Sequence, residues 1–102
     1  MDEVATRLLS GLLRNNIAIP SAVEAIRPYQ FRLPADRLVF GAIVTEYACS
    51  GVVDLVAVFL HLQRCGQLET VGGPVRLADI WDHGCEGDEC AELILEIAER
   101  VE

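Results

Sequence analysis

The residues best suited to chemistry lie close together near the carboxyl end of the chain. Positions 82 to 90 hold one histidine, two cysteines and four acids: Asp82, His83, Cys85, Glu86, Asp88, Glu89 and Cys90. Thiolate and imidazole groups are ligands that zinc prefers, so His83, Cys85 and Cys90 are candidate metal ligands. Their His-x-Cys-x₄-Cys spacing is not that of a zinc knuckle, which needs a second closely spaced pair. The alternative is a solvated acidic loop that carries two thiols.

The sequence offers no other recognisable catalytic arrangement. Nucleophilic catalysis needs a Cys or Ser beside a base and an orienting group, and neither His61 nor His83 falls in such a pattern. His61 is expected to be a partly exposed or internally bonded helix residue. The chain also lacks the GxxxxGK[ST] phosphate loop. We therefore expect a protein that is not an enzyme and that needs no cofactor.

Composition indicates one soluble globular domain over residues 1–102. The chain is 52% hydrophobic, which argues against disorder. Its net charge is −8, with eight arginines and no lysine, so direct DNA binding is disfavoured and a basic protein partner is favoured. The longest apolar run, Leu55 to Leu60, is far shorter than the ~20 residues of a membrane span. The sequence shows no signal peptide, and we expect a cytoplasmic protein in which Cys49 and Cys65 are buried as small hydrophobic residues.

Helical spacing of apolar residues predicts the first elements. Residues 2–15 form a helix with the apolar stripe Val4, Leu8, Leu9, Leu12 and Leu13. After a linker at 17–20, Ser21 and Glu24 form a capping box for a short helix that ends near Ile26. In the loop that follows, Tyr29, Phe31 and Leu33 either hold the chain onto the core or form an exposed partner patch.

The middle of the chain reads as two helices separated by a glycine. Pro34 suits the first helical position and Gly51 the left-handed stop of the first helix. Asp54 can cap the second helix, which continues to Gly66. Because several residues of 52–60 are β-branched, a buried strand is the alternative there. Gly73 and Pro74 then begin another helix.

The carboxyl end supplies the candidate partner residues. Trp81 is either a partner anchor, since Trp is enriched at interface hot spots, or a residue at the rim of the core. After a loop at 82–87, a last helix is expected from Asp88, with its apolar stripe at Leu93, Ile94, Ile97 and Val101. Glu92, Glu96, Glu99 and Arg100 are expected to face outward. This helix either pairs subunits or packs on its own core.

Residues 3–80 resemble the N-terminal domain of DnaB-type replicative helicases. The resemblance is carried by Leu8 to Leu13, Asn16, Phe31, Pro34, Arg37, Phe40, Gly51, Val53 to Val56, Leu60, Gly66, Leu68, Val71 to Gly73 and Leu77–Ala78. The chain departs from the family pattern at three positions within this stretch. At one of them, Arg32 replaces the second aromatic residue of the family's Phe-Tyr pair. The family usually has His where Asp36 stands and an aromatic residue where Arg76 stands. The Thr-Pro/Ser-Ala-Ala-Asn stretch is replaced by residues 81–87.

The resemblance implies an all-α fold of five to six short helices. It also implies a non-catalytic interaction and oligomerisation module in DNA replication that docks primase or other replisome proteins. Residues 88–102 would be the last helix, possibly a remnant of the family's dimerisation hairpin, with Trp81, Leu93, Ile94, Ile97 and Val101 as interface candidates. Self-association as a dimer is expected, with a monomer as the alternative. The competing function is a small regulatory protein with a metal-binding loop at 82–90.

Overall fold

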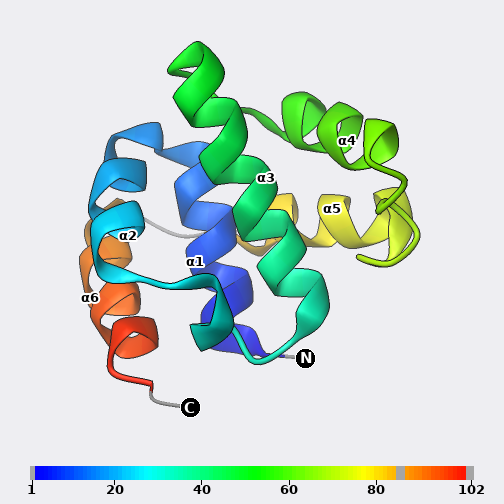
Figure 1. Ribbon diagram of the computed structural model, residues 1–102. Coiled ribbons are helices and arrows are strands. Elements are labelled where there is room, and N and C mark those ends of the chain that lie inside the picture. Colours follow the sequence, from blue (N-terminus) through cyan, green and yellow to red (C-terminus); the bar gives the residue numbers. More distant parts are fainter. Residues whose placement is uncertain (1, 85–86, 101–102) are drawn as a thin grey trace.

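The computed structural model describes residues 2–84 and 87–100, and these form helices joined by short connections (Figure 1). The α-helices are α1 (Glu3–Arg14), α2 (Ile19–Ala25), α3 (Pro34–Ser50), α4 (Leu55–Arg64), α5 (Gly73–His83) and α6 (Gly87–Ala98). Two short 3₁₀ turns, Asn16–Ala18 and Pro28–Gln30, flank α2. The described residues contain no strand. The predicted all-α fold is confirmed.

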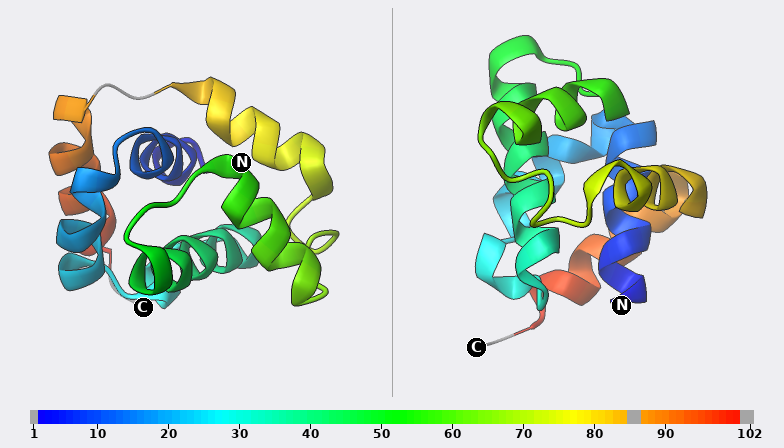
Figure 2. Two further views of the ribbon diagram at one scale, coloured as in Figure 1. Left: turned by 90° about the horizontal axis from the view of Figure 1, so that it is seen from above. Right: turned by 90° about the vertical axis from the view of Figure 1, so that its right-hand side faces the viewer.

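Helix α1 is the centre of the molecule, with α2 and α6 on one side and α3 and α5 around the other (Figures 1 and 2). Its predicted bounds differ from the observed ones by one residue at each end. Asp2 caps the helix, because its Oδ1 accepts a hydrogen bond of 3.3 Å from the amide of Ala5. Leu8, Leu9 and Leu12 are fully buried. A helix buried on several faces can anchor the others, since each neighbour packs a stripe against it.

Helix α2 begins earlier than the sequence suggested, and the predicted capping box is wrong. The helix starts at Ile19 with Pro20 in its first turn, and no side chain caps it. Ser21 therefore lies inside the first turn rather than at the cap. The preceding 3₁₀ turn leads directly into α2, so the expected linker at 17–20 is itself mostly helical. Proline tolerates this position because the first helical amides have no acceptor within the helix.

One aromatic residue holds the connection between α2 and α3 onto the core. Phe31 is fully buried, and its ring centroid lies 4.9 Å from that of Phe40 on α3. Arg37 donates a hydrogen bond of 2.7 Å to the Phe31 carbonyl. Tyr29 and Leu33, by contrast, are 50% and 37% exposed. The expectation that all three residues pack inward is therefore wrong for Tyr29 and Leu33.

The predicted start and end of α3 and the predicted start of α4 are confirmed. Pro34 lies in the first turn of α3, and Gly51 ends the helix at φ +74°, a conformation that costs glycine little. Asp54 caps α4 by accepting a hydrogen bond of 2.8 Å from the Ala57 amide. Residues 55–64 are helical, so the strand alternative for this segment is wrong. The local cap outweighed the β-branched composition.

The cap at Asp54 gives a first prediction. Asp54→Ala is expected to lower the free energy of unfolding by about 1 kcal/mol, the usual cost of losing an N-cap side chain. Chemical denaturation followed by circular dichroism measures this. Asp54→Asn keeps a capping oxygen and is the control, because it should retain most of the stability. Equal losses in both variants would contradict a capping role.

The end of α1 is joined to the connection between α3 and α4 by a single side chain. Oδ1 of the Asn16 side chain accepts a hydrogen bond of 2.8 Å from the backbone N–H of Val53. Nδ2 of the same side chain donates one of 3.0 Å to the Val53 carbonyl. Asn16 also donates to the Leu12 carbonyl at 2.9 Å. These bonds fix the α3–α4 connection and so place α4 relative to the core. They supply a structural role for Asn16, which the sequence identified only as the end of the first helix.

Two cysteine predictions are wrong. Cys49 and Cys65 are both exposed, although each has apolar neighbours in the sequence. Cys49 lies in the last turn of α3, and Cys65 follows the end of α4. At these helix ends, no other helix covers the side chains. Apolar neighbours in sequence do not ensure burial where the helix extends beyond its packing partner.

Within the described residues, no single helix is long and apolar enough to cross a membrane. The pair α3 and α4 meets the length and composition test only when the two helices are taken together, and they are bent by 107° relative to each other.

Candidate protein-interaction surface

The predicted interface residues of the last helix lie in the core of this chain. Leu93, Ile94 and Ile97 are 5%, 6% and 0% exposed, and α6 packs against α1 and α2. Val101 lies outside the described residues. Of the two alternatives for this helix, the structure has the one in which it packs on its own core. The hypothesis that these residues also pair subunits stays untested.

Polar contacts hold α6 against α1 and against the 3₁₀ turn Pro28–Gln30. Arg7 of α1 forms an ion pair with Glu89 of α6. Gln30 donates hydrogen bonds of 2.8 and 2.9 Å to the carbonyls of Ala98 and Arg100, which satisfies acceptors that the end of a helix leaves unpaired. Helix α6 is thus fixed by polar contacts as well as by its buried stripe.

Trp81 lies at the rim of the core, at the end of α5. Its side chain is partly buried and packs against core residues. The guanidinium carbon of Arg14 lies 4.7 Å from the centroid of its ring, a distance typical of a cation–π contact. Arg14 also donates hydrogen bonds of 2.8 and 2.6 Å to the Trp81 carbonyl. These contacts join the ends of α1 and α5, whereas a role as partner anchor stays a prediction.

The residues proposed as metal ligands are only partly described. His83 ends α5 with its side chain partly buried, and Cys90 is buried in α6. Cys85 lies outside the described residues. Among the residues that the structure does place, no group of three or more His, Cys, Asp or Glu side chains could hold a metal ion. His61, for which an internal bond was expected, places its Nδ1 2.9 Å from Oε2 of Glu46.

A buried ion pair joins α3 to α5 next to α1. Asp36 is fully buried, and its Oδ1 accepts a hydrogen bond of 3.1 Å from Arg76. Arg76 also donates one of 2.9 Å to Thr6 Oγ1 on α1. The other carboxylate oxygen of Asp36 has no hydrogen-bond partner among the described residues. Burial raises the pKa of Asp36 above its ordinary value, and the positive charge of Arg76 opposes this rise.

Asp36 and Arg76 are two of the positions at which residues 3–80 depart from the family pattern, which has a histidine and an aromatic residue there. They lie 40 positions apart, yet their side chains are in contact. Because one replacement supplies the charge that the other needs, the two departures form a single structural exchange. The sequence alone did not show that these two positions are in contact. To detect the Asp36–Arg76 pair from the sequence, one would have had to know that α3 and α5 are neighbours.

A double-mutant cycle tests this exchange. Asp36→His and Arg76→Tyr are each expected to destabilise the fold, because each leaves one charge of the pair unmatched. The double variant is expected to be more stable than the sum of the two losses predicts, by about 0.5–3 kcal/mol, the usual coupling between contacting residues. Chemical denaturation of the four proteins gives the coupling free energy. Strictly additive losses would contradict the exchange.

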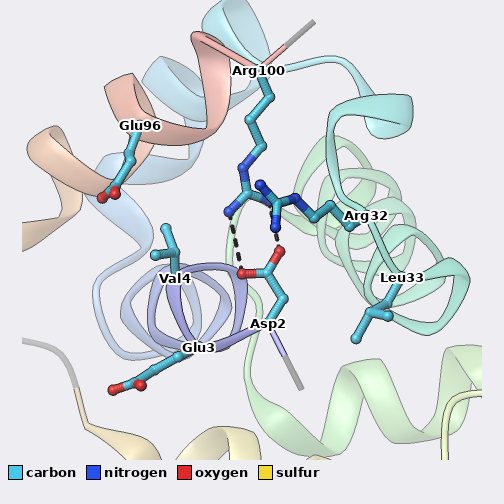
Figure 3. A pocket seen from close by; sticks show the side chains of 7 residues that line it. All are labelled: Asp2, Glu3, Val4, Arg32, Leu33, Glu96 and Arg100. Carbon is cyan, nitrogen blue, oxygen red and sulfur yellow. Dashed lines mark hydrogen bonds and ion pairs between the residues drawn. The ribbon is translucent and has the colours of Figure 1, made fainter. Parts of the chain in front are cut away.

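A second charged cluster closes the molecule where its two described ends meet (Figure 3). Arg100 donates hydrogen bonds of 2.6 and 3.2 Å to the two carboxylate oxygens of Asp2. The pair lines an open cleft of about 540 Å³, together with Arg32 and Glu96. Arg100 was expected to face outward, which is wrong. Because Arg100 and Asp2 are paired with each other, we interpret this cluster as a link between the start of α1 and the end of α6.

The electrostatics of Asp2 predict a pH effect. Burial acts to raise the pKa of Asp2, but hydrogen bonds from Arg100 and Ala5 and the charges of Arg100 and Arg32 outweigh it, and the pKa lies below the ordinary 3.8. A carboxyl group whose pKa is lower in the folded than in the unfolded protein stabilises the fold at pH values above its unfolded pKa. That stabilisation is lost as the pH falls through its folded pKa.

Asp2→Asn, which keeps the helix cap, is therefore expected to cost about 1.5–3 kcal/mol at neutral pH, the range for hydrogen bonds to charged groups. Thermal unfolding of both proteins over a pH series measures this. The difference should shrink as the pH falls below the ordinary pKa and vanish only below the lowered pKa of folded Asp2. A difference independent of pH would contradict the ionic role.

Several exposed apolar side chains lie on α4, just before it and at the start of α5. Val52, Val56, Leu60 and Val75 are 68%, 62%, 46% and 72% exposed. Between the two helices lies a groove of about 190 Å³ lined by Leu55, Val56, Phe59, Pro74 and Leu77, which we call the α4–α5 groove. Sequence reasoning missed this surface. A helix with apolar residues on more than one face can bury only some of them, so Val58 and Leu62 are buried whereas Val56 and Leu60 are exposed.

Comparison with known proteins places this fold in a family. Residues 3–99 match the family model described as the DnaB-like helicase N terminal domain. The chain is 31% identical over 65 residues to the replicative DNA helicase DnaB of Leifsonia xyli subsp. xyli, covering 64% of this chain and 14% of that protein. It is 32% identical over 78 residues to the replicative DNA helicase DnaB of Rhodothermus marinus, covering 76% of this chain and 8% of that protein.

A solved structure agrees with these matches. The crystal structure of the N-terminal domain of DnaB helicase from Mycobacterium tuberculosis superposes with a TM-score of 0.88 at 28% sequence identity. The match covers 95% of this chain and 70% of that one. This chain spans only a small part of the length of the two helicases named above. The family match over residues 3–99 and the shared helical fold together show that the chain belongs to the DnaB-like helicase N-terminal domain family.

Proposed function

We propose that this chain is a non-catalytic interaction module of the replicative helicase N-terminal type, which self-associates and docks primase or other replisome proteins. The observation that supports this most directly is the family match over residues 3–99. The exposed apolar residues of α4 and α5 supply a surface of the kind that marks protein contacts. The module acts by presenting helix faces, and its role lies in DNA replication.

Burial of the last helix restricts how self-association can occur. Leu93 and Ile97 are buried within the chain, so pairing through them would require α6 to leave its own core. A dimer of the structure as it stands must therefore use exposed faces. Helix α6 still presents Leu95, which is 60% exposed.

Light scattering after size exclusion, under reducing conditions, tests self-association. A dimer at micromolar concentration is the expected result, and a monomer at every concentration would contradict it. Primase docking is tested separately by calorimetric titration with the primase of the same organism. A saturable one-to-one complex is expected, and the absence of heat and of co-elution would contradict this part of the proposal.

A further inference from the structure

The α4–α5 groove is open to solvent and lined by apolar side chains. Val56 on α4 is 62% exposed, Pro74 on α5 is also exposed, and the lining includes the partly buried Phe59 and the buried Leu77. Helices α4 and α5 lie side by side and run in opposite directions, joined by residues 65–72 (Figure 2). Two antiparallel helices with apolar residues along their shared edge form a seat into which a third helix can pack.

The apolar surface continues beyond the groove toward the end of α1. Val52 lies in the connection that precedes α4 and is 68% exposed. Ile17 is 86% exposed, and its neighbour Asn16 is bonded to Val53. These bonds hold the backbone beside Ile17 next to the backbone beside Val52. Exposed apolar residues that gather beside an apolar groove are typical of a binding site, whereas scattered single ones are normal on a solvated face.

The charges around this surface are acidic. Segment 52–83 carries four exposed carboxylates that take part in no ion pair among the described residues, namely Asp54, Glu69, Asp79 and Asp82. Its two arginines, Arg64 and Arg76, each pair with a carboxylate of α3. Asp54 directly precedes α4, and Glu69 lies in the connection between α4 and α5, so both carboxylates are at the ends of the helices that form the groove. Asp79 and Asp82 line a separate cleft beside Arg76. The groove therefore combines an apolar floor with an excess of negative charge nearby.

We propose that the α4–α5 groove binds the apolar face of an amphipathic helix from another protein whose flanking residues are basic. This inference rests on the proposed docking function and specifies the chemistry of the partner. A groove between helices selects apolar anchors at i, i+3 or i+4 and i+7. The ten residues of α4 span about 15 Å at 1.5 Å per residue, which fits two to three turns of the bound helix.

Charge complementarity decides between possible occupants. A second copy of this chain carries the same net charge of −8, so symmetric pairing through the groove would bring like charges together. An anionic lipid surface is disfavoured for the same reason. A basic partner helix gains from the carboxylates in both association rate and specificity.

Synthetic peptides test this inference on the intact chain. The probe is a fluorescently labelled helix of about 14 residues made of leucine and lysine, with the leucines at helical spacing along one face. One control peptide has the same composition in scrambled order, and another has glutamate in place of lysine. Fluorescence anisotropy is expected to show saturable one-to-one binding of the probe, at least tenfold tighter than binding of either control.

Two matched variants locate the binding site. Val56→Asp is expected to weaken probe binding at least tenfold, although the added negative charge by itself would attract the basic peptide. Leu95→Asp adds the same charge on α6 at a residue of similar exposure, 60% against 62%, and is expected to leave binding unchanged. Pro74→Asp repeats the test from the α5 side, because Pro74 is exposed and lines the groove. Because all three residues are exposed, circular dichroism should show the same helix content in each variant.

Three outcomes would overturn the inference: equal binding of the scrambled peptide, equal binding of the glutamate peptide, or equal weakening by Val56→Asp and Leu95→Asp. Each would show that no apolar groove selects a basic helix. Failure of the proposed function is distinguishable, because it would appear as loss of primase binding and of self-association in the unmodified chain. Primase binding that survives alongside failed peptide binding would overturn the groove inference alone.

Discussion

Arg76→Ala is expected to lower the free energy of unfolding by about 3–5 kcal/mol, the cost of removing one partner of a buried ion pair. Asp36 is fully buried, and one of its two carboxylate oxygens already lacks a hydrogen-bond partner among the described residues. Without Arg76, its remaining oxygen would lose the hydrogen bond of 3.1 Å that it accepts. For a domain whose total stability is commonly about 5–15 kcal/mol, this loss is a large fraction. Urea denaturation at neutral pH gives the value.

The pH dependence separates this effect from simple loss of packing. Burial already raises the pKa of Asp36, and removal of Arg76 should raise it further. A carboxyl group whose pKa is raised in the folded protein destabilises the fold as the pH rises through that pKa. The loss in free energy of unfolding caused by Arg76→Ala should therefore be largest at neutral pH and smaller in acid. Arg64→Ala is the control, because Arg64 is 70% exposed in its pair with Glu46 and should cost less than about 1 kcal/mol. A deficit independent of pH would point to packing alone.

Ile97→Asp is expected to unfold the chain. Ile97 is fully buried in α6 against the central helix, so the aspartate would place an unpaired charge in an apolar site at a cost of several kcal/mol. The variant also loses the burial of an isoleucine side chain, which contributes about 1.5–3 kcal/mol. Together these losses are comparable with the whole stability of a small domain. Circular dichroism and thermal unfolding would show loss of helix and of a cooperative transition.

Leu95→Asp is the matched control on the same helix. Leu95 is 60% exposed, so the variant should stay folded with a change of about 0.5 kcal/mol or less. The pair of variants also tests the earlier alternative for the last helix. A folded monomer from Ile97→Asp, in place of an unfolded chain, would mean that α6 contributes to subunit pairing more than to its own core.

Local features of the sequence determined where several helices begin and end. Pro34, Gly51 and Asp54 act through their own backbone and side-chain chemistry within one turn, and the structure places each as expected. The order and spacing of residues 3–80 also sufficed for the resemblance to the helicase domain, which the family match over residues 3–99 confirms. The predicted capping box at Ser21 is wrong because the helix begins at Ile19, two residues before Ser21. Pro20 lies in its first turn, where proline is an equally local start signal.

Only the tertiary structure decided which apolar and charged residues meet. The apolar spacing of Leu8, Leu9 and Leu12 is the same as that of Val58, Phe59 and Leu62. Leu9 is nevertheless fully buried, whereas Phe59 is only partly buried. The contact between Asp36 and Arg76 across 40 positions depends on α3 and α5 both lying against α1, and no local pattern encodes that. Helix formation depends on neighbours three or four residues away, whereas burial, charge pairing and the open groove depend on how whole helices share one central partner.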